Sequence, residues 1–168
     1  MTAEEVKKLL GLQPHPREGG WYVQTYKASE QIAASGFSDE RYAGPRRTGT
    51  AIYYLLEPGT FSEMHRLQSD EVFHFYLGDA VEMLQLLPDG SGRVVVIGND
   101  LVAGERPQVV VERGVWQGSQ LKAGGSWALM GCSVSPGFEF EDYDAGERAL
   151  LSKGWPEFAT MIVALTRD

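Results

Sequence analysis

The dominant pattern along the chain is a series of short apolar runs separated by turns that contain glycine or proline. From residue 50 onward these runs cover 50–59, 71–78, 81–98, 108–114, 115–122 and 126–136, and the run over 81–98 is divided by a turn around Asp89-Gly90. Short runs bounded by turn residues are typical of β-strands. Eight or more strands at such spacing, without long helical patterns between them, predict an all-β antiparallel sandwich or barrel.

Both ends of the chain show helical patterns instead. Thr2 and Glu5 match a capping box, an apolar face follows over 6–10, and Gly11 is a suitable stop. We therefore expect a short N-terminal helix. Residues 145–153 and 156–166 predict two short C-terminal helices, the second beginning at Pro156.

The segment between the first helix and residue 50 is less regular. Residues 21–26 predict a strand, and the polar stretch 29–48 predicts a surface loop. Within it, Arg46 and Arg47 are either solvated side chains before the next strand or contacts for an anionic ligand. His15, between Pro14 and Pro16, is either a structural loop residue or lies at the rim of a pocket.

Several predicted strands are apolar on both faces. In 50–56, Ile52, Tyr54 and Leu56 alternate with Ala51, Tyr53 and Leu55. A sheet with one face in water would alternate apolar and polar residues instead. The outer face must therefore be covered by the terminal segments or by a second subunit, and on this basis we predict a homodimer.

Length and composition limit the class of protein. The 168 residues fit one domain spanning 1–168. The net charge of −8 opposes binding to nucleic acid, and no apolar run approaches the roughly 18 residues of a membrane helix. A single cysteine, Cys132, is compatible with a reducing compartment, so we expect a cytoplasmic protein. Cys132 itself lies in an apolar strand, where a small buried hydrophobic role is expected.

The stretch over 59–78 has a regular spacing of glycine, histidine and carboxylate. Five residues separate Gly59 from His65, one separates His65 from Leu67, three separate Leu67 from Glu71, and six separate Glu71 from Gly78. This spacing resembles the first motif of the cupin superfamily, except that Leu67 occupies the position of a second histidine.

A second segment, Glu112 to Gln117, resembles the second cupin motif. Gly114 is in register, but Glu112 replaces a proline and Gln117 replaces the last histidine ligand. Further blocks, among them HPREGGWY, TAIYYLL and GCSVSPGFEFEDY, resemble a small-cupin subfamily of uncharacterised function. The resemblance implies a double-stranded β-helix, or jelly-roll barrel, with the ligand site inside it.

The replacement of two histidine ligands, by Leu67 and Gln117, predicts that any metal ion would bind only weakly. His65, Glu71 and Gln117 would be the only ligands for a divalent ion, and an amide oxygen is a poor ligand for transition metals. His74 lies three residues from Glu71, so on a regular strand the two side chains face opposite ways. A weakly bound divalent metal, in a dioxygenase or isomerase, is one alternative.

Metal-free chemistry is a second alternative. Some cupins resemble sugar epimerases that use a histidine base, a carboxylate and a tyrosine acid. Here His65 would be the general base, Asp70 or Glu71 would orient it, and Tyr54 or Tyr143 would be the acid. This hypothesis gives an isomerase or epimerase for a small sugar derivative.

A non-catalytic binding barrel is the third alternative. Aromatic residues on the strands either line a ligand pocket or belong to the core. The residues that we expect at such a pocket, besides His65 and Glu71, are Gln117, Trp116, Phe73, Phe75, Tyr54, Ser62 and Arg47. In every alternative the partner is an unidentified small molecule.

Overall fold

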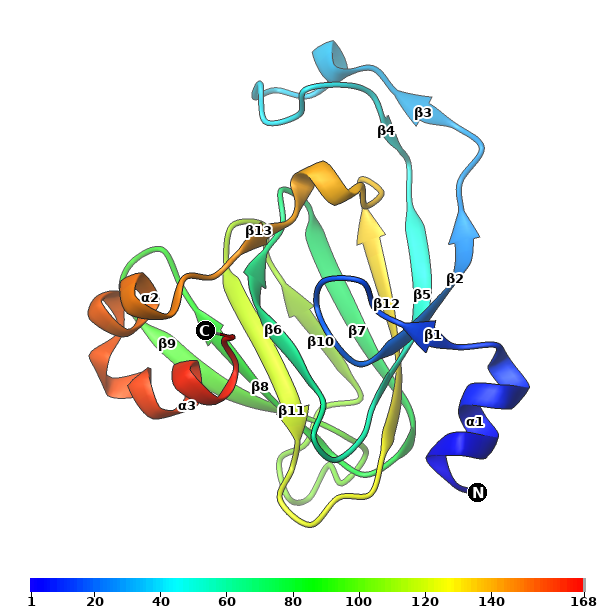
Figure 1. The fold of residues 1–168 in the computed structure, drawn as a ribbon. Helices are drawn as coiled ribbons and strands as arrows, with labels where there is room; N and C mark the ends of the chain where they lie inside the picture. The colour runs from blue at the N-terminus through cyan, green and yellow to red at the C-terminus, as the bar shows by residue number, and fades with distance from the viewer. Residues whose placement is uncertain (168) are drawn as a thin grey trace.

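The protein is described by a computed structural model that covers residues 1–167. Its main body consists of two antiparallel sheets that face each other as a jelly-roll barrel (Figure 1). The larger sheet has six strands in the order β1-β2-β5-β12-β7-β10. Their bounds are β1 (Gln13–Pro14), β2 (Trp21–Lys27), β5 (Thr50–Leu56), β12 (Ala128–Ser135), β7 (Asp70–Gly78) and β10 (Gln108–Val111).

The second sheet has five strands in the order β13-β6-β11-β8-β9. Their bounds are β13 (Asp144–Ala145), β6 (Phe61–Arg66), β11 (Trp116–Leu121), β8 (Val81–Leu86) and β9 (Gly92–Ile97). A separate two-stranded hairpin, β3 (Gln31–Ile32) and β4 (Arg46–Arg47), extends beyond the open end of the barrel (Figure 1). The predicted all-β class is confirmed.

Helices occur near the two ends of the chain. They are α1 (Ala3–Leu10), α2 (Arg148–Gly154) and α3 (Ala159–Ala164). The capping box is confirmed, because the Thr2 hydroxyl accepts from the Glu5 amide and the Glu5 carboxylate accepts from the Thr2 amide. The last predicted helix is shorter than expected, since its first turn, Pro156–Phe158, is a 3-10 turn.

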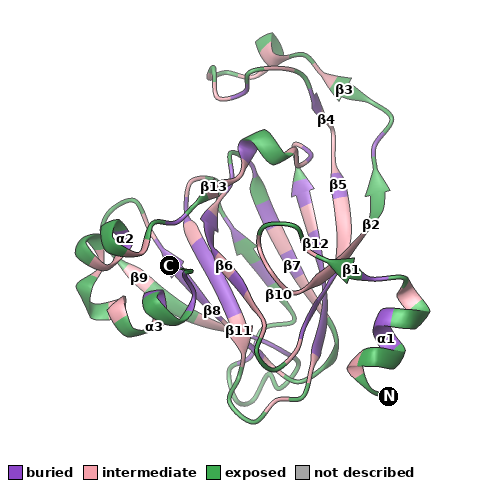
Figure 2. Cartoon of the chain, in the orientation of Figure 1, coloured by how far each residue is buried: buried purple, intermediate pink, exposed green. Residues whose placement is uncertain are grey.

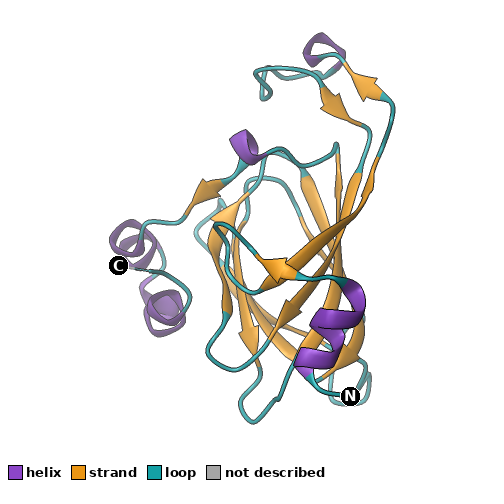
Figure 3. Cartoon of the chain, turned by 45° about the vertical axis from the view of Figure 1, so that its right-hand side comes forward, coloured by secondary structure: helices purple, strands orange, loops and turns teal. Residues whose placement is uncertain are grey.

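The terminal helices cover the outer faces of the barrel (Figures 1 and 3). On the six-stranded sheet, Val6 of α1 packs with Leu55 and Leu129. On the five-stranded sheet, Leu151 and Ile162 of the C-terminal helices pack with Leu84. These contacts give a physical reason for strands that are apolar on both faces. The homodimer stays a prediction.

Between the sheets, one part of the barrel interior is filled by apolar side chains, and Figure 2 colours the buried stretches of the strands purple. This core includes Phe73, Met83, Ile97, Val109 and Met130, all of them buried. Burial of this kind, at roughly 25 cal/mol for each Å² removed from water, is the main source of the barrel's stability. The opposite part of the interior is hollow and carries polar groups.

The turns at the two motif glycines depend on glycine. Gly59 has φ +84° in the turn after β5, and Gly78 has φ +96° at the end of β7. A side chain on Gly78 would also collide with the carbonyl oxygen of Trp127. Only glycine adopts such a conformation without strain, so the two glycines fix where the strand of His65 begins and where the strand of Glu71 ends.

The stretch 29–48 differs from the predicted surface loop. Besides the β3–β4 hairpin, it holds Arg46, which is buried rather than solvated. Arg46 donates from Nε and Nη2 to the two carboxylate oxygens of Asp142, with both distances 2.7 Å. This buried pair joins the hairpin to the segment that follows β12. In residues 1–167 no helix is long and apolar enough to cross a membrane.

Candidate functional site

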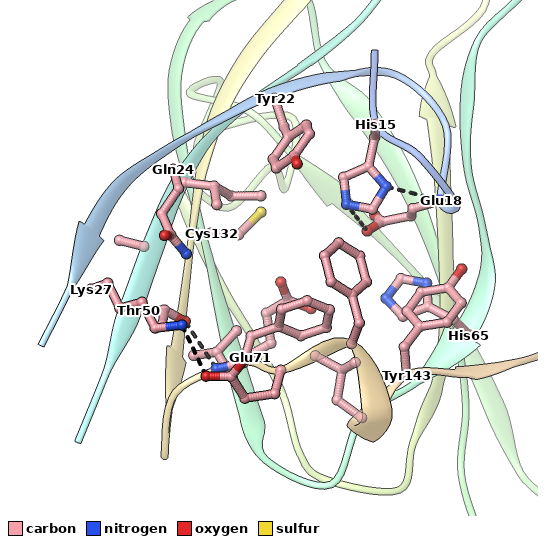
Figure 4. A pocket seen from close by; sticks show the side chains of 17 residues that line it. His15, Glu18, Tyr22, Gln24, Lys27, Thr50, His65, Glu71, Cys132 and Tyr143 are labelled. Atoms are coloured by element: carbon pink, nitrogen blue, oxygen red, sulfur yellow. Dashed lines mark hydrogen bonds and ion pairs between the residues drawn. The ribbon is translucent and has the colours of Figure 1, made fainter. Parts of the chain in front are cut away.

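A pocket of about 320 Å³ occupies the hollow part of the barrel interior (Figure 4). Its walls come from strands β2, β5, β6, β7 and β12, from the loop between β1 and β2, and from the segment over 138–143. Both apolar and polar side chains line it. The polar and titratable side chains that line the pocket are His15, Glu18, Tyr22, Gln24, Lys27, Thr50, His65, Glu71, Cys132, Glu139 and Tyr143.

His65 on β6 lines this pocket and is buried, with 1% exposure. Its Nδ1 lies 2.7 Å from the carbonyl oxygen of Glu63. A carbonyl can only accept, so Nδ1 carries the proton and the Nε2 of the neutral ring has a free lone pair. The ring of Tyr143 stacks on His65 with a centroid distance of 4.9 Å and an interplanar angle of 17°. His65 is therefore held in one orientation with an acceptor available to a ligand.

Glu71 on β7 lines the pocket and is buried, and its Oε2 accepts from Gln117 Nε2 at 2.7 Å. Burial raises the pKa of Glu71 to about 7, and the charge of Glu18 adds to the rise. His65, Gln117 and Cys132 act in the opposite direction. Glu71 therefore exchanges a proton near neutral pH, which suits a residue that both gives and takes protons.

Cys132 on β12 also lines the pocket and is buried, as expected. Burial raises the pKa of its thiol well above the ordinary value, and the charge of Glu71 adds to this effect. The thiol therefore stays protonated at neutral pH and is a poor nucleophile.

His15 and Glu18 reach the pocket from the loop between β1 and β2. Of the two readings of His15, the structure favours the one that places it at the pocket. Its Nδ1 accepts from the amide of Glu18 at 2.9 Å, and its Nε2 lies 3.9 Å from Glu18 Oε2. The other carboxylate oxygen of Glu18 accepts from the hydroxyl of Ser62, one of the residues expected at the ligand site. Burial lowers the pKa of His15, while Glu18 acts to raise it.

Lys27 and Glu139 form an ion pair of 3.0 Å at the outer part of the pocket, where both side chains are partly exposed. Glu139 belongs to the segment that also supplies Phe138, Phe140 and Tyr143 to the pocket wall. The buried bond between Arg46 and Asp142 fixes this segment to β4. The segment thus forms a wall that this buried ion pair helps to hold in place.

The structure places three of the expected pocket residues in the apolar core instead. Tyr54, Phe73 and Phe75 pack in the core cluster. Tyr54 is fully buried and donates from its hydroxyl to the carbonyl of Gly19 at 2.9 Å, and burial raises its pKa well above the ordinary value. The geometry therefore does not support Tyr54 as the acid, whereas Tyr143 lies against His65.

Trp116 and Arg47 also lie away from the pocket. Trp116 packs on the outer cluster beside the C-terminal helices, with the guanidinium of Arg66 4.5 Å from its ring centroid. Arg47 donates from Nη1 to the carbonyls of Ala28 and Ser29, at 3.2 and 2.8 Å. The alternation of side chains along β11 explains why Trp116 lies outside the barrel, because its neighbour Gln117 points inward to Glu71.

His74 lies on the outer face of β7, as the alternation predicts. Its Nε2 is 3.2 Å from the hydroxyl of Ser133, and its Nδ1 is 3.4 Å from the side-chain amide nitrogen of Gln108. Asp70 is also directed elsewhere, since its carboxylate accepts from the amide of Arg113. The group that orients His65 is therefore the Glu63 carbonyl and not a carboxylate.

Comparison with known proteins gives one family. The family model described as Cupin superfamily (DUF985) matches residues 4–146. The chain belongs to the cupin superfamily. No curated protein matches the sequence.

Solved structures agree with this assignment. A protein from Shewanella oneidensis is 33% identical with a TM-score of 0.86, and the match covers 99% of this chain and 98% of that one. A hypothetical protein from Leishmania major is 30% identical with a TM-score of 0.89, over 100% of both chains. Oxalate decarboxylase from Bacillus subtilis is 12% identical, with a TM-score of 0.53 over 92% of this chain and 37% of that one. That last likeness supports the cupin fold alone.

The donor atoms do not fit the metal cage that the cupin motifs imply. Leu67, buried beside the pocket, has no donor atom, and the Glu71 carboxylate is bound by the Gln117 amide. Across residues 1–167 there is no group of three or more His, Cys, Asp or Glu side chains placed to hold a metal ion. The remaining Oε1 of Gln117 is buried without a hydrogen-bond partner among these residues. One imidazole and an amide do not make a strong site.

Proposed function

We propose that this cupin binds a small polar carbonyl compound and transfers a proton at the carbon beside its carbonyl, with His65 as the base. Such a reaction is an isomerisation or epimerisation of a sugar-like molecule. The observation that carries the proposal is the bond from His65 Nδ1 to the Glu63 carbonyl, which leaves Nε2 as an acceptor within the pocket. General bases act through such a free lone pair.

Two further features support acid–base chemistry. Glu71, with its pKa near 7, can hold a proton or release it at the pH of a cell. Tyr143 stacks on the base and its hydroxyl is buried without a partner among the described residues, so a ligand hydroxyl or carbonyl can complete its hydrogen bonding. The proton transfer uses no metal ion.

The size and charge of the pocket support a small neutral ligand. Its volume of about 320 Å³ lies at the lower end of the range of roughly 300–1,000 Å³ that small-molecule sites occupy. Of the described residues that line it, Lys27 alone is a lysine or arginine, and it is paired with Glu139. Because Glu18 and Glu71 are acidic side chains of the lining, a phosphate at the reacting end would be unfavourable.

The test is hydrogen exchange from solvent into unphosphorylated sugars. D-glucose, D-mannose, D-fructose and D-ribose are incubated with the protein in D₂O, and loss of the signal from the proton beside the carbonyl is followed by proton NMR. The proposal expects exchange of at least one sugar by the wild type and none by His65→Asn. In that variant the Asn amide can still donate to the Glu63 carbonyl, but the acceptor at Nε2 is gone.

Matched controls separate the alternatives. His74→Asn, on the outer face, should exchange like the wild type. A sugar that raises the melting temperature without any exchange would support a non-catalytic ligand-binding barrel instead. Exchange that disappears after dialysis against EDTA and returns with a divalent ion would support the weak metal site of His65, Glu71 and Gln117.

A further inference from the structure

The pocket contains two imidazoles whose protons lie on different nitrogens. Nδ1 of His15 accepts from the backbone amides of Glu18 and Arg17, at 2.9 and 3.4 Å. A nitrogen that accepts cannot carry the proton, so neutral His15 is protonated at Nε2. His65 shows the reverse arrangement, since its Nδ1 donates to a carbonyl. One ring therefore offers the pocket a donor and the other offers an acceptor.

The Nε2–H group of His15 is available to a ligand. The His15 side chain is only 5% exposed, and its Nε2 lies 3.9 Å from Glu18 Oε2, which is longer than a hydrogen bond. Figure 4 shows the ring beside Glu18 at the edge of the same pocket that holds His65. A nearly buried donor without a short partner gains the most from a ligand acceptor.

The residue Glu63 connects the two imidazoles. Its amide donates to the carbonyl of Glu18 at 2.9 Å, and its own carbonyl accepts from His65 Nδ1 at 2.7 Å. Arg167 reinforces the link, because its Nη1 lies 2.6 Å from the Arg17 carbonyl and 3.1 Å from the Glu63 carboxylate. The loop of His15 and the strand of His65 are thus fixed to each other before any ligand binds, as electrostatic catalysis requires.

We propose that His15 is a second catalytic residue, which donates its Nε2–H to the carbonyl oxygen of a neutral hydroxy-carbonyl substrate. This inference rests on the proposed function. His65 Nε2 takes the proton from the carbon beside the carbonyl, and the C–H electron pair becomes the C=C bond of an enolate. The carbonyl π electrons move to the oxygen, where His15 stabilises the charge. Return of a proton from the His65 imidazolium to the same carbon restores the carbonyl and the base and exchanges that hydrogen with solvent. Return to the former carbonyl carbon, with the proton of the neighbouring hydroxyl passing to the former carbonyl oxygen, gives the isomer and restores the base.

The test uses His15→Asn in the same D₂O exchange assay. Asn Oδ1 can accept the amides of Glu18 and Arg17 in place of Nδ1, so the loop is retained, but the side chain ends before the position of Nε2. We expect the exchange rate to fall by a factor of about 100 or more, the loss seen when one oxyanion donor is removed. His74→Asn is the matched control and should leave the rate unchanged. A wild-type melting temperature for His15→Asn would show that the fold is intact.

The outcomes separate this inference from the function on which it rests. If the wild type exchanges a sugar and His15→Asn exchanges it equally fast, the role of His15 is wrong while the proposed function stands. If His15→Asn proves unstable, His15→Gln is the second test variant. Its side-chain amide can donate near the position of Nε2, so it should keep part of the exchange rate. A complete loss of exchange in folded His15→Gln would contradict the donor role. If the wild type exchanges none of the sugars, the proposed function fails, and the role of His15 fails with it.

Discussion

The two walls of the pocket are built in different ways. Strands β6, β7 and β12 place His65, Glu71 and Cys132 through the register of the sheets, in which Gln117 pairs with His65 and Val134 pairs with Glu71. The other wall, formed by the loop over 15–20 and the segment over 138–143, lies outside the ladders of the two sheets. Its position depends on a few individual bonds. A wall of this kind should therefore be easier to displace by a single substitution than the strand wall.

The largest expected loss of stability comes from breaking the buried ion pair of Arg46 and Asp142, which helps to hold the segment over 138–143. Arg46→Met leaves Asp142 as an unpaired buried carboxylate, so we expect the free energy of unfolding to fall by about 3–5 kcal/mol. Urea denaturation measures the loss. Arg113→Met, which removes an exposed ion pair with Asp39, should cost about 1 kcal/mol or less. Equal and small losses in both variants would show that the segment over 138–143 is held by other contacts.

Glu71 on the strand wall should make the free energy of unfolding depend on pH. The pKa of Glu71 rises from 4.5 to about 7 on folding, so the folded protein keeps a proton that the unfolded chain releases. The free energy of unfolding should therefore decrease as the pH rises from about 4.5 to 7, by about 3 kcal/mol for this group, and level off above that range. In Glu71→Gln this decrease should disappear, and the variant should be more stable than the wild type at pH 8.

The control for Glu71 is an exposed carboxylate on the same barrel. Glu112→Gln should keep the decrease between pH 4.5 and 7, because Glu112 is exposed. Urea denaturation at several pH values compares the three proteins. The same slope in Glu71→Gln and the wild type would mean that Glu71 is ionised in the folded protein throughout this range.

The difference between the walls also explains what the sequence could predict. Motif spacing and strand alternation were sufficient to put His65 and Glu71 inside the barrel and His74 outside, because side chains on a strand alternate between faces. The same rule does not tell a core aromatic from a pocket aromatic, so Tyr54, Phe73 and Phe75 were expected at the pocket but lie in the core. Depth along the barrel axis decides this, and the sequence alone does not give the depth.

The loop wall was harder to predict for a different reason. Loops have no period, so the positions of His15 and Glu18 depend on long-range bonds such as those of Glu63 and Arg167. The available signal was the sequence HPREGG, in which prolines and glycines restrict the backbone around a histidine and a glutamate. For Arg46 the alternatives were a solvated side chain or a contact for an anionic ligand. Neither included its buried bond to Asp142, because that partner lies 96 residues away in the chain.

The central claim is that one pocket holds an acceptor imidazole at His65 and a donor imidazole at His15. Long-range proton–nitrogen NMR of uniformly ¹⁵N-labelled protein tests it directly. The chain has three histidines, so the Asn variants at 15, 65 and 74 assign every signal. At pH 8 we predict a proton on Nδ1 of His65 and on Nε2 of His15. A proton on Nε2 of His65, or on Nδ1 of His15, would contradict the account.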